Sequence, residues 1–329
     1  MADSFQRSHQ TILDEQTIDI TASNTLARNL DWGFRQLVWV CALAVGAILI
    51  WITWIVFQDA QPAIAKFGLG FIVSQEWDIS EQLYGGLPYI YGSIICSLIA
   101  LIVALPLGLS VAILTSENFL PTAIKVPIGF LVELIASIPS VIIGLWGIFV
   151  FIPLLMPIQV MLFEYLGWMP IFNTEPFGAS MLVAGLILAV MILPTIAAIS
   201  RDVLLSIPPQ LRTASMALGA TRWETIVNIL LPAASSGVIG ATILALGRAL
   251  GETMAVTMVI GNSNIISASL LAPGYTIPAV MANQFAEAID ELHIGALMYL
   301  ALILFFITLG VNSIAVLLVE SIRRRREVN

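Results

Sequence analysis

The sequence predicts an all-α integral membrane protein with about six transmembrane helices. Three observations lead to this fold class. Hydrophobic residues make up 59% of the 329 residues and charged residues only 10%, whereas ordinary soluble domains carry about a quarter charged residues. Apolar runs recur that are long enough to cross a bilayer, which takes about 20 residues in a helix. Nearly all basic residues lie in alternate segments between these runs.

In chain order, the first element is a polar, acid-rich segment, residues 1–35. It has no short apolar core followed by a small-residue cleavage site, so it is not expected to be a signal peptide. Six apolar runs follow, and each is expected to form one membrane-spanning helix. The third contains Pro139 and Pro153, so a bend or an early end is expected within it. The approximate bounds of the runs are 36–57, 89–115, 127–155, 179–199, 233–260 and 295–319.

The distribution of basic residues sets the expected orientation, because short cytoplasmic loops keep Lys and Arg. The segments 58–88, 156–178 and 261–294 contain only one basic residue, Lys66, and are therefore expected on the extracytoplasmic side of the membrane. Both termini are expected in the cytoplasm. Apart from Arg248, which lies within the fifth run, the other basic residues fall on that side: Arg7, Arg28, Arg35, Lys125, Arg201, Arg212, Arg222 and Arg323 to Arg326.

These assignments divide the chain into five parts. A cytoplasmic tail, 1–35, precedes the first transmembrane helix, 36–57, and an extracytoplasmic loop, 58–88. A core, 89–322, contains a cytoplasmic loop at 200–232. A basic cytoplasmic tail, 323–329, ends the sequence.

Several classes of function are disfavoured by the composition. The formal net charge of -8 argues against nucleic-acid binding. Cys41 and Cys96 lie in different apolar runs, so neither a disulfide framework nor metal-ligand spacing is expected. His9 and His293 suggest no metal site, no proton relay and no enzyme centre. No cofactor is therefore expected on this chain.

The most informative segment is 208–232, in the predicted cytoplasmic loop. Pro208 suits a helix start, and Gly219 can adopt the left-handed conformation that ends a helix. Thr221 and Glu224, three residues apart, predict a capping box at the start of a second helix. We therefore expect two helices joined at a glycine elbow.

This segment resembles the cytoplasmic loop of ABC importer permeases, whose pattern is Glu-Ala-Ala, three residues, Gly, nine residues, then Ile-x-Leu-Pro. Two positions depart from the pattern: Thr213 stands in place of Glu, and Ser215 in place of Ala. The resemblance implies that the elbow docks as a coupling helix in a cleft of a cytoplasmic ATPase; the alternative is an elbow lying on the membrane surface. The positions that fall on this spacing are Thr213, Ala214, Ser215, Gly219, Ile229, Leu231 and Pro232. The expected coupling residues are Thr213, Ala214, Gly219, Ala220 and Pro232.

Further segments at 137–149, 193–204, 247–256 and 273–288 resemble the PstC family of phosphate-specific permeases. The resemblance spans about 89–319 and implies a type I ABC importer permease fold in the inner membrane of a bacterium. It also implies inorganic phosphate as the substrate. The implied partners are a second permease, PstA, two copies of the ATPase PstB, and an extracytoplasmic phosphate-binding protein, PstS. ATP and Mg²⁺ would belong to PstB, because this chain lacks a P-loop pattern.

Three charged residues within apolar runs are candidates for the substrate path. Arg248 lies roughly 20 Å into its helix and costs on the order of 3 kcal/mol there, so it requires compensation. Glu252, at i+4, is its expected partner, either in a structural ion pair or beside a bound anion. Glu133 could pair with Arg248, line the path or lie near the cytoplasmic rim.

Other functions stay open at this point. An importer of another oxyanion, such as sulfate or molybdate, fits the same residues. A secondary transporter would need coupling-ion ligands or a proton relay, and a membrane enzyme would need a catalytic constellation. Neither is visible in the sequence.

Overall fold

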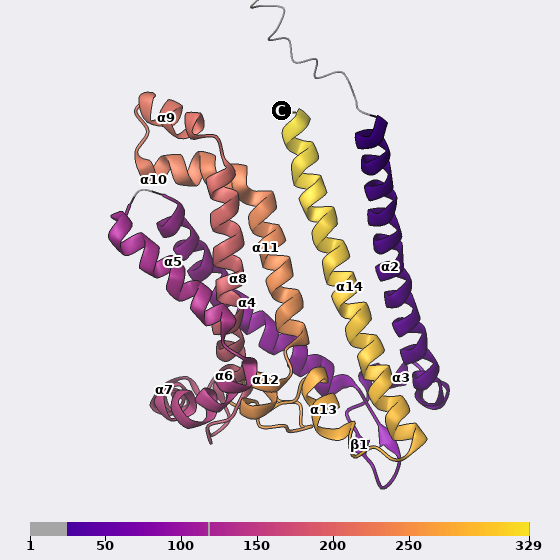
Figure 1. Cartoon of the computed structure of the whole chain (residues 1–329). Coiled ribbons are helices and arrows are strands. Elements are labelled where there is room, and N and C mark those ends of the chain that lie inside the picture. The colour runs from indigo at the N-terminus through magenta and orange to yellow at the C-terminus, as the bar shows by residue number, and fades with distance from the viewer. Residues whose placement is uncertain (1–24, 118, 329) are drawn as a thin grey trace, which may run out of the picture. The chain divides into compact units, whose positions relative to one another are not determined.

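Helices dominate the structure, a computed structural model that describes residues 25–117 and 119–328 (Figure 1). The first 24 residues of the predicted cytoplasmic tail lie outside the described residues. Contacts divide the chain into two units, one ending at Ile55 and one beginning at Val56. The described chain contains six helices long and apolar enough to cross a membrane. The predicted all-α class is therefore confirmed.

The six candidate spans differ from the predicted runs mainly at their ends and at two breaks. The first helix, α2 (Thr25–Phe67), is longer than the predicted run 36–57 at both ends. The last, α14 (Glu291–Val328), continues as helix through most of the predicted basic tail. The six spans are Asn29–Phe67, Leu87–Ser116, Ser140–Leu166, Met181–Ser206, Arg222–Gly251 and Glu291–Ser321.

Helices α4 (Leu87–Ser116) and α8 (Met181–Ser206) form the central pair of the second unit. Glycines allow their close approach. A Cβ at Gly185 would lie 2.6 Å from Cβ of Ile99, and one at Gly108 would lie 3.0 Å from Cβ of Ile196. Small residues at such crossings let helices pack closely where lipid supplies no hydrophobic drive between them. The side chain of Ile196 is fully buried in the resulting core.

The third predicted helix, 127–155, is wrong as a single span. Helix α5 (Thr122–Ser137) ends where Ile138 adopts an extended conformation, φ −70° and ψ 127°, before Pro139. Proline disfavours the helical conformation of the preceding residue, which explains the break. A new span then begins at Ser140. It consists of α6 (Ser140–Trp146), the π-helix η1 (Gly147–Phe151) and α7 (Ile152–Leu166).

The fifth predicted helix, 233–260, is also divided. It begins earlier, with α10 (Arg222–Thr225) and the π-helix η3 (Ile226–Leu230), and continues as α11 (Leu231–Gly251). Glu252 then adopts φ −70° and ψ 125°, so α11 ends there. A separate short helix, α12 (Met254–Val259), follows.

Two of the predicted outer loops are packed elements at one end of the second unit. The segment 58–88 contains α3 (Gly70–Val73) and a hairpin of β1 (Trp77–Asp78) with β2 (Leu83–Tyr84), in antiparallel register Trp77 to Tyr84. The segment 261–294 contains α13 (Ile277–Gln284). We call this the hairpin end; α9 (Pro209–Ala217) and α10 lie at the opposite end, the elbow end (Figure 1).

Aromatic contacts hold the hairpin end together. The Trp77 indole N–H donates to Oε1 of Gln284 at 3.0 Å, which joins the hairpin to α13. The rings of Tyr84 and His293 stack with centroids 5.4 Å apart, and Trp77 packs edge-on against Tyr89 at 4.8 Å. These contacts tie the hairpin to the starts of α4 and α14.

Candidate functional site

The predicted glycine elbow is present between α9 and α10. Gly219 has φ +92°, and a Cβ there would meet no atom of the described chain within 4 Å. Backbone conformation alone, rather than crowding, therefore selects glycine at this position. The N–H of Gly219 donates to the carbonyl of Met216, and that of Ala220 to the carbonyl of Ser215. These bonds satisfy the last carbonyls of α9.

The second helix of the elbow starts with the predicted capping box. The N–H of Thr221 donates to Oε2 of Glu224 at 2.7 Å, and the N–H of Glu224 donates to the Thr221 hydroxyl at 3.2 Å. The capping box is therefore confirmed. It fixes the direction in which α10 leaves the turn.

The two departures from the importer pattern have different structural consequences. Thr213 is exposed, and its hydroxyl donates back to the Gln210 carbonyl of its own helix at 3.1 Å. Ser215 is buried, and its hydroxyl lies 2.9 Å from that of Thr225. A serine at this position thus supplies a hydrogen bond between α9 and α10 that alanine cannot make.

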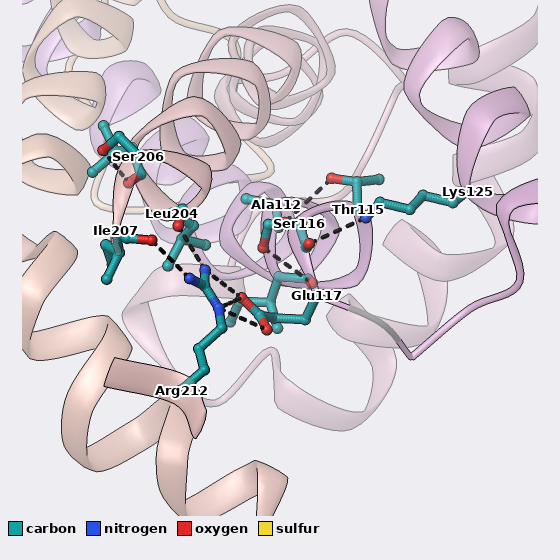
Figure 2. A network of polar contacts seen from close by, with 11 residues as sticks. Ala112, Thr115, Ser116, Glu117, Lys125, Leu204, Ser206, Ile207 and Arg212 are labelled. Carbon is teal, nitrogen blue, oxygen red and sulfur yellow. Dashed lines mark hydrogen bonds and ion pairs between the residues drawn. The ribbon is translucent and has the colours of Figure 1, made fainter. Parts of the chain in front are cut away.

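Arg212 anchors α9 to the membrane helices, a role that the sequence did not reveal. Its Nη2 lies 2.9 Å from Oε1 of Glu117, at the C-terminal cap of α4, and its Nε donates to both Glu117 oxygens at 3.1 and 3.3 Å. Nη1 and Nη2 also donate to the carbonyls of Ile207 and Leu204, at 2.9 and 2.7 Å. Figure 2 shows Arg212 between the ends of α4 and α8. We call this set of contacts the Arg212 clamp.

Large apolar side chains project from the elbow. Leu218, next to the glycine turn, is 90% exposed, and Trp223 is 64% exposed. Ala214 is exposed, Ala220 is half-buried, and Pro232 lies in the first turn of α11. An apolar tip on a hydrogen-bonded support is suited to insertion into a partner protein.

The expected i+4 pair of Arg248 and Glu252 is wrong in its geometry. Because α11 ends at Gly251, Glu252 does not continue the helix face of Arg248. Among the described residues no ion pair joins the two; instead Glu252 Oε1 accepts from the N–H of Ala255 at 3.4 Å, at the start of α12. The sequence pattern failed here because an unbroken helix was assumed.

Arg248 is exposed on α11. A Cβ at Gly240, Gly247 or Gly251 would meet no described atom outside α11 within 4 Å. Gly240 faces α14 across a pocket. We call the part of α11 around Arg248, Gly247 and Gly251 the free face, because the second unit leaves space beside these two glycines. Such a face can line a path or receive another subunit.

The structure brings Glu133 to Arg201 and not to Arg248. Glu133 lines two adjoining pockets between α5 and α8 that Arg201 also lines, and Arg248 lines neither of them. Sequence reasoning had placed Arg201 in the cytoplasmic loop because it is basic. It lies instead within α8, which runs on to Ser206.

Comparison with known proteins adds to this geometry. A family model described as binding-protein-dependent transport system inner membrane component matches residues 104–328. The chain is 39% identical over 320 residues to the phosphate transport system permease protein PstC of Xylella fastidiosa strain Temecula1, covering 96% of this chain and 98% of that protein. It is 42% identical over 264 residues to PstC of Mesorhizobium japonicum, covering 79% and 80% of the two chains.

Solved structures show the same fold at low sequence identity. A bacterial ABC transporter involved in the import of alginate aligns with a TM-score of 0.53 at 16% identity, covering 86% of this chain and 97% of that chain. An inward-facing structure of the MetNI methionine ABC transporter aligns with a TM-score of 0.52 at 16% identity, covering 70% and 93%. The likeness concerns the arrangement of helices.

Proposed function

Since the chain belongs to the family of binding-protein-dependent transport system inner membrane components, we propose that it is a permease subunit of an ATP-driven phosphate importer. The observation that carries this proposal is the similarity over 96% of the chain to a phosphate permease, together with an intact elbow at the matching residues. Sulfate or molybdate importers are the alternative class. The relatives cited above are named for phosphate, which favours that anion.

The partners follow from the same proposal. A second permease, PstA, would cover the free face of α11 that carries Arg248. A dimer of the ATPase PstB would receive the elbow, and a phosphate-binding protein, PstS, would deliver substrate to the hairpin end. ATP and Mg²⁺ belong to PstB in this scheme. The elbow and both termini then face the cytoplasm of a bacterium, and the chain spans its inner membrane.

The elbow would couple the partner ATPase to the membrane helices. Leu218 and Trp223 supply the apolar contact, and the Arg212 clamp passes a displacement of α9 to the ends of α4 and α8. Those two helices are the most extensively packed pair in the second unit. A movement of α9 is therefore expected to move the core as one body.

Arg248 would act on the anion itself. A guanidinium offers a planar fork of N–H donors that suits the oxygens of phosphate. Because no ion pair neutralises Arg248 within the described chain, its charge is available to a ligand or to the second permease. Glu252 would set the start of α12 and so the direction of the path beyond Arg248.

Reconstitution tests the proposal directly. The chain is assembled with PstA, PstB and PstS in proteoliposomes, and uptake of labelled phosphate is measured with and without ATP. ATP-dependent uptake that excess sulfate and molybdate fail to compete is the expected result. Uptake of sulfate or molybdate in preference to phosphate would refute the substrate, and uptake that does not depend on ATP would refute the importer class.

A further inference from the structure

Arg201 carries a buried nitrogen that nothing in the described chain satisfies. It lies on α8, five residues before the end of that helix at Ser206. Its Nε is buried and has no hydrogen-bond partner among the described residues. A buried charged donor without a partner is costly, because its hydration has been lost and not replaced. Arg201 as a whole is half-buried, so a group that binds beside it would meet the Nη donors rather than the inaccessible Nε.

Space for such a group exists between α5 and α8. A pocket of about 430 Å³ is lined by Arg201, Lys125, Gly129, Glu133 and three apolar neighbours. Gly129 leaves room for the guanidinium, since a Cβ there would lie only 3.3 Å from Nη1 of Arg201. A pocket of about 430 Å³ is large enough for a multi-oxygen anion and water.

Lys125 supplies a second positive charge at this pocket. Its Nζ donates to the carbonyl of Ser116, at the end of α4, at 3.1 Å (Figure 2). An ammonium has three N–H donors, so this bond fixes its position and leaves donors for a ligand. Arg201 and Lys125 together outweigh the single carboxylate of Glu133. The pocket therefore has a net positive charge at the elbow end of the membrane helices.

We propose that Arg201 and Lys125 form a binding site for a phosphate-type oxyanion, separate from Arg248. The donors of a guanidinium and an ammonium match the several oxygens of a phosphate group. Two sources share this chemistry: free phosphate and the phosphate of a lipid headgroup. For free phosphate, the site is a second station on the proposed route and rests on the proposed function.

Protection of a reporter cysteine tests the site without any transport measurement. Cys41 and Cys96 are replaced by serine, and Val126, an exposed residue of the pocket wall, is replaced by cysteine. The complex with PstA and PstB is purified in lipid-free detergent and reacted with a small thiol reagent. Inorganic phosphate at about twice its dissociation constant should slow the reaction about threefold. Potassium chloride at equal ionic strength should not.

Matched variants identify the residues responsible. Arg201→Gln and Lys125→Gln should each weaken protection by about tenfold in phosphate concentration, as expected for loss of a charge-assisted contact. Lys66→Gln is the control, because Lys66 also donates to a single carbonyl, that of Gln82, at 3.1 Å, but at the hairpin end. Glu133→Gln should strengthen protection, since it removes the opposing charge. Co-purification of PstA with each variant shows that assembly is intact. If Arg201→Gln does not assemble, the result with Lys125→Gln decides.

The same assay separates the two sources. Protection by phosphate supports a free-anion site. Protection only by a short-chain phosphatidylglycerol supports a headgroup site. Protection by neither, or protection that persists in both Gln variants, overturns the proposal. Phosphate uptake without protection would support the proposed function and refute this site. Protection in a complex that imports no phosphate would support the site and refute the proposed function.

Discussion

Replacing Arg212 with alanine removes the clamp that joins α9 to α4 and α8. The variant leaves the Glu117 carboxylate without its ion-pair partner and frees the carbonyls of Leu204 and Ile207. Removing one member of a fully buried ion pair costs about 3 to 5 kcal/mol. The side chains of Arg212 and Glu117 are 19% and 15% exposed, so water compensates part of the loss. We expect about 2 kcal/mol.

That free energy has a measurable consequence for docking. If the clamped arrangement of α9 is the one that the proposed partner ATPase, PstB, binds, destabilising it by about 2 kcal/mol should lower the apparent affinity for PstB about 30-fold. Phosphate uptake per ATP hydrolysed should fall as well, because a displaced α9 no longer moves α4 and α8. Affinity is measured by titrating PstB onto the immobilised PstA pair. Arg35→Ala, which removes the same side chain from α2, is the control.

A double-mutant cycle decides whether the contact itself is responsible. Arg212→Ala, Glu117→Ala and the double variant are compared in the same titration. The double variant should resemble the single ones, with an interaction free energy of about 2 kcal/mol. Single effects that add in the double variant to within about 0.5 kcal/mol would refute the clamp, as would an Arg212→Ala variant with unchanged affinity and unchanged uptake per ATP.

The remaining predictions concern the turn, the substrate path and the orientation. Gly219→Ala should weaken PstB binding by about 1 kcal/mol, because alanine tolerates the positive φ of this turn poorly. Gly310 has equally open space around it but lies within a helix, so Gly310→Ala should leave PstB binding unchanged. Equal effects of the two substitutions would contradict the argument from backbone conformation. Arg248→Gln and the double variant Arg248→Gln with Glu252→Gln should both assemble with PstA, because neither breaks an ion pair. Both should lower phosphate uptake at least about tenfold, because the guanidinium that contacts the anion is lost. Near-normal uptake in both variants would show that Arg248 does not lie on the path. Leu218 and Ile289 are 90% and 94% exposed. Leu218→Cys should react with an impermeant thiol reagent added on the cytoplasmic side, and Ile289→Cys with the same reagent added on the other side. The opposite result would reverse the orientation.

The sequence predicted those features of the structure that depend on neighbouring residues. Charge-free runs located the second, fourth and sixth spans to within several residues but misplaced the third and fifth at both ends. Thr221 with Glu224 predicted the capping box, because a cap depends on residues close in the chain. The break at Pro139 was indicated by the proline but outweighed by the length of the apolar run. The end of α11 at Gly251 had no comparably strong signal, since neither Glu252 nor Thr253 breaks a helix by itself.

Long-range pairs lay beyond prediction for a different reason. Arg212 and Glu117 are 95 residues apart, and Trp77 and Gln284 are 207 apart. Each of these side chains had several possible partners in the sequence. The actual partner is set by tertiary packing, which places the end of α4 beside α9 for Arg212 and the hairpin beside α13 for Trp77. Arg201 was misplaced for the related reason that a basic residue near a helix end reads as a loop residue. The candidate charges were thus found in the sequence, but their partners were not.

The π-helix η3 joins the elbow to α11, and one residue sets the angle between them. A π-helical turn contains one residue more than an α-helical turn, so deleting one residue within Ile226–Leu230 would restore a continuous α-helix. Each α-helical residue contributes a rotation of about 100° and a rise of about 1.5 Å. Such a deletion would swing Leu218 and Trp223 about a quarter of a turn around the axis of α11 while leaving every residue of the elbow unchanged. The direction in which the elbow presents Leu218 and Trp223 therefore depends on the number of residues in η3 as much as on the residues of the elbow.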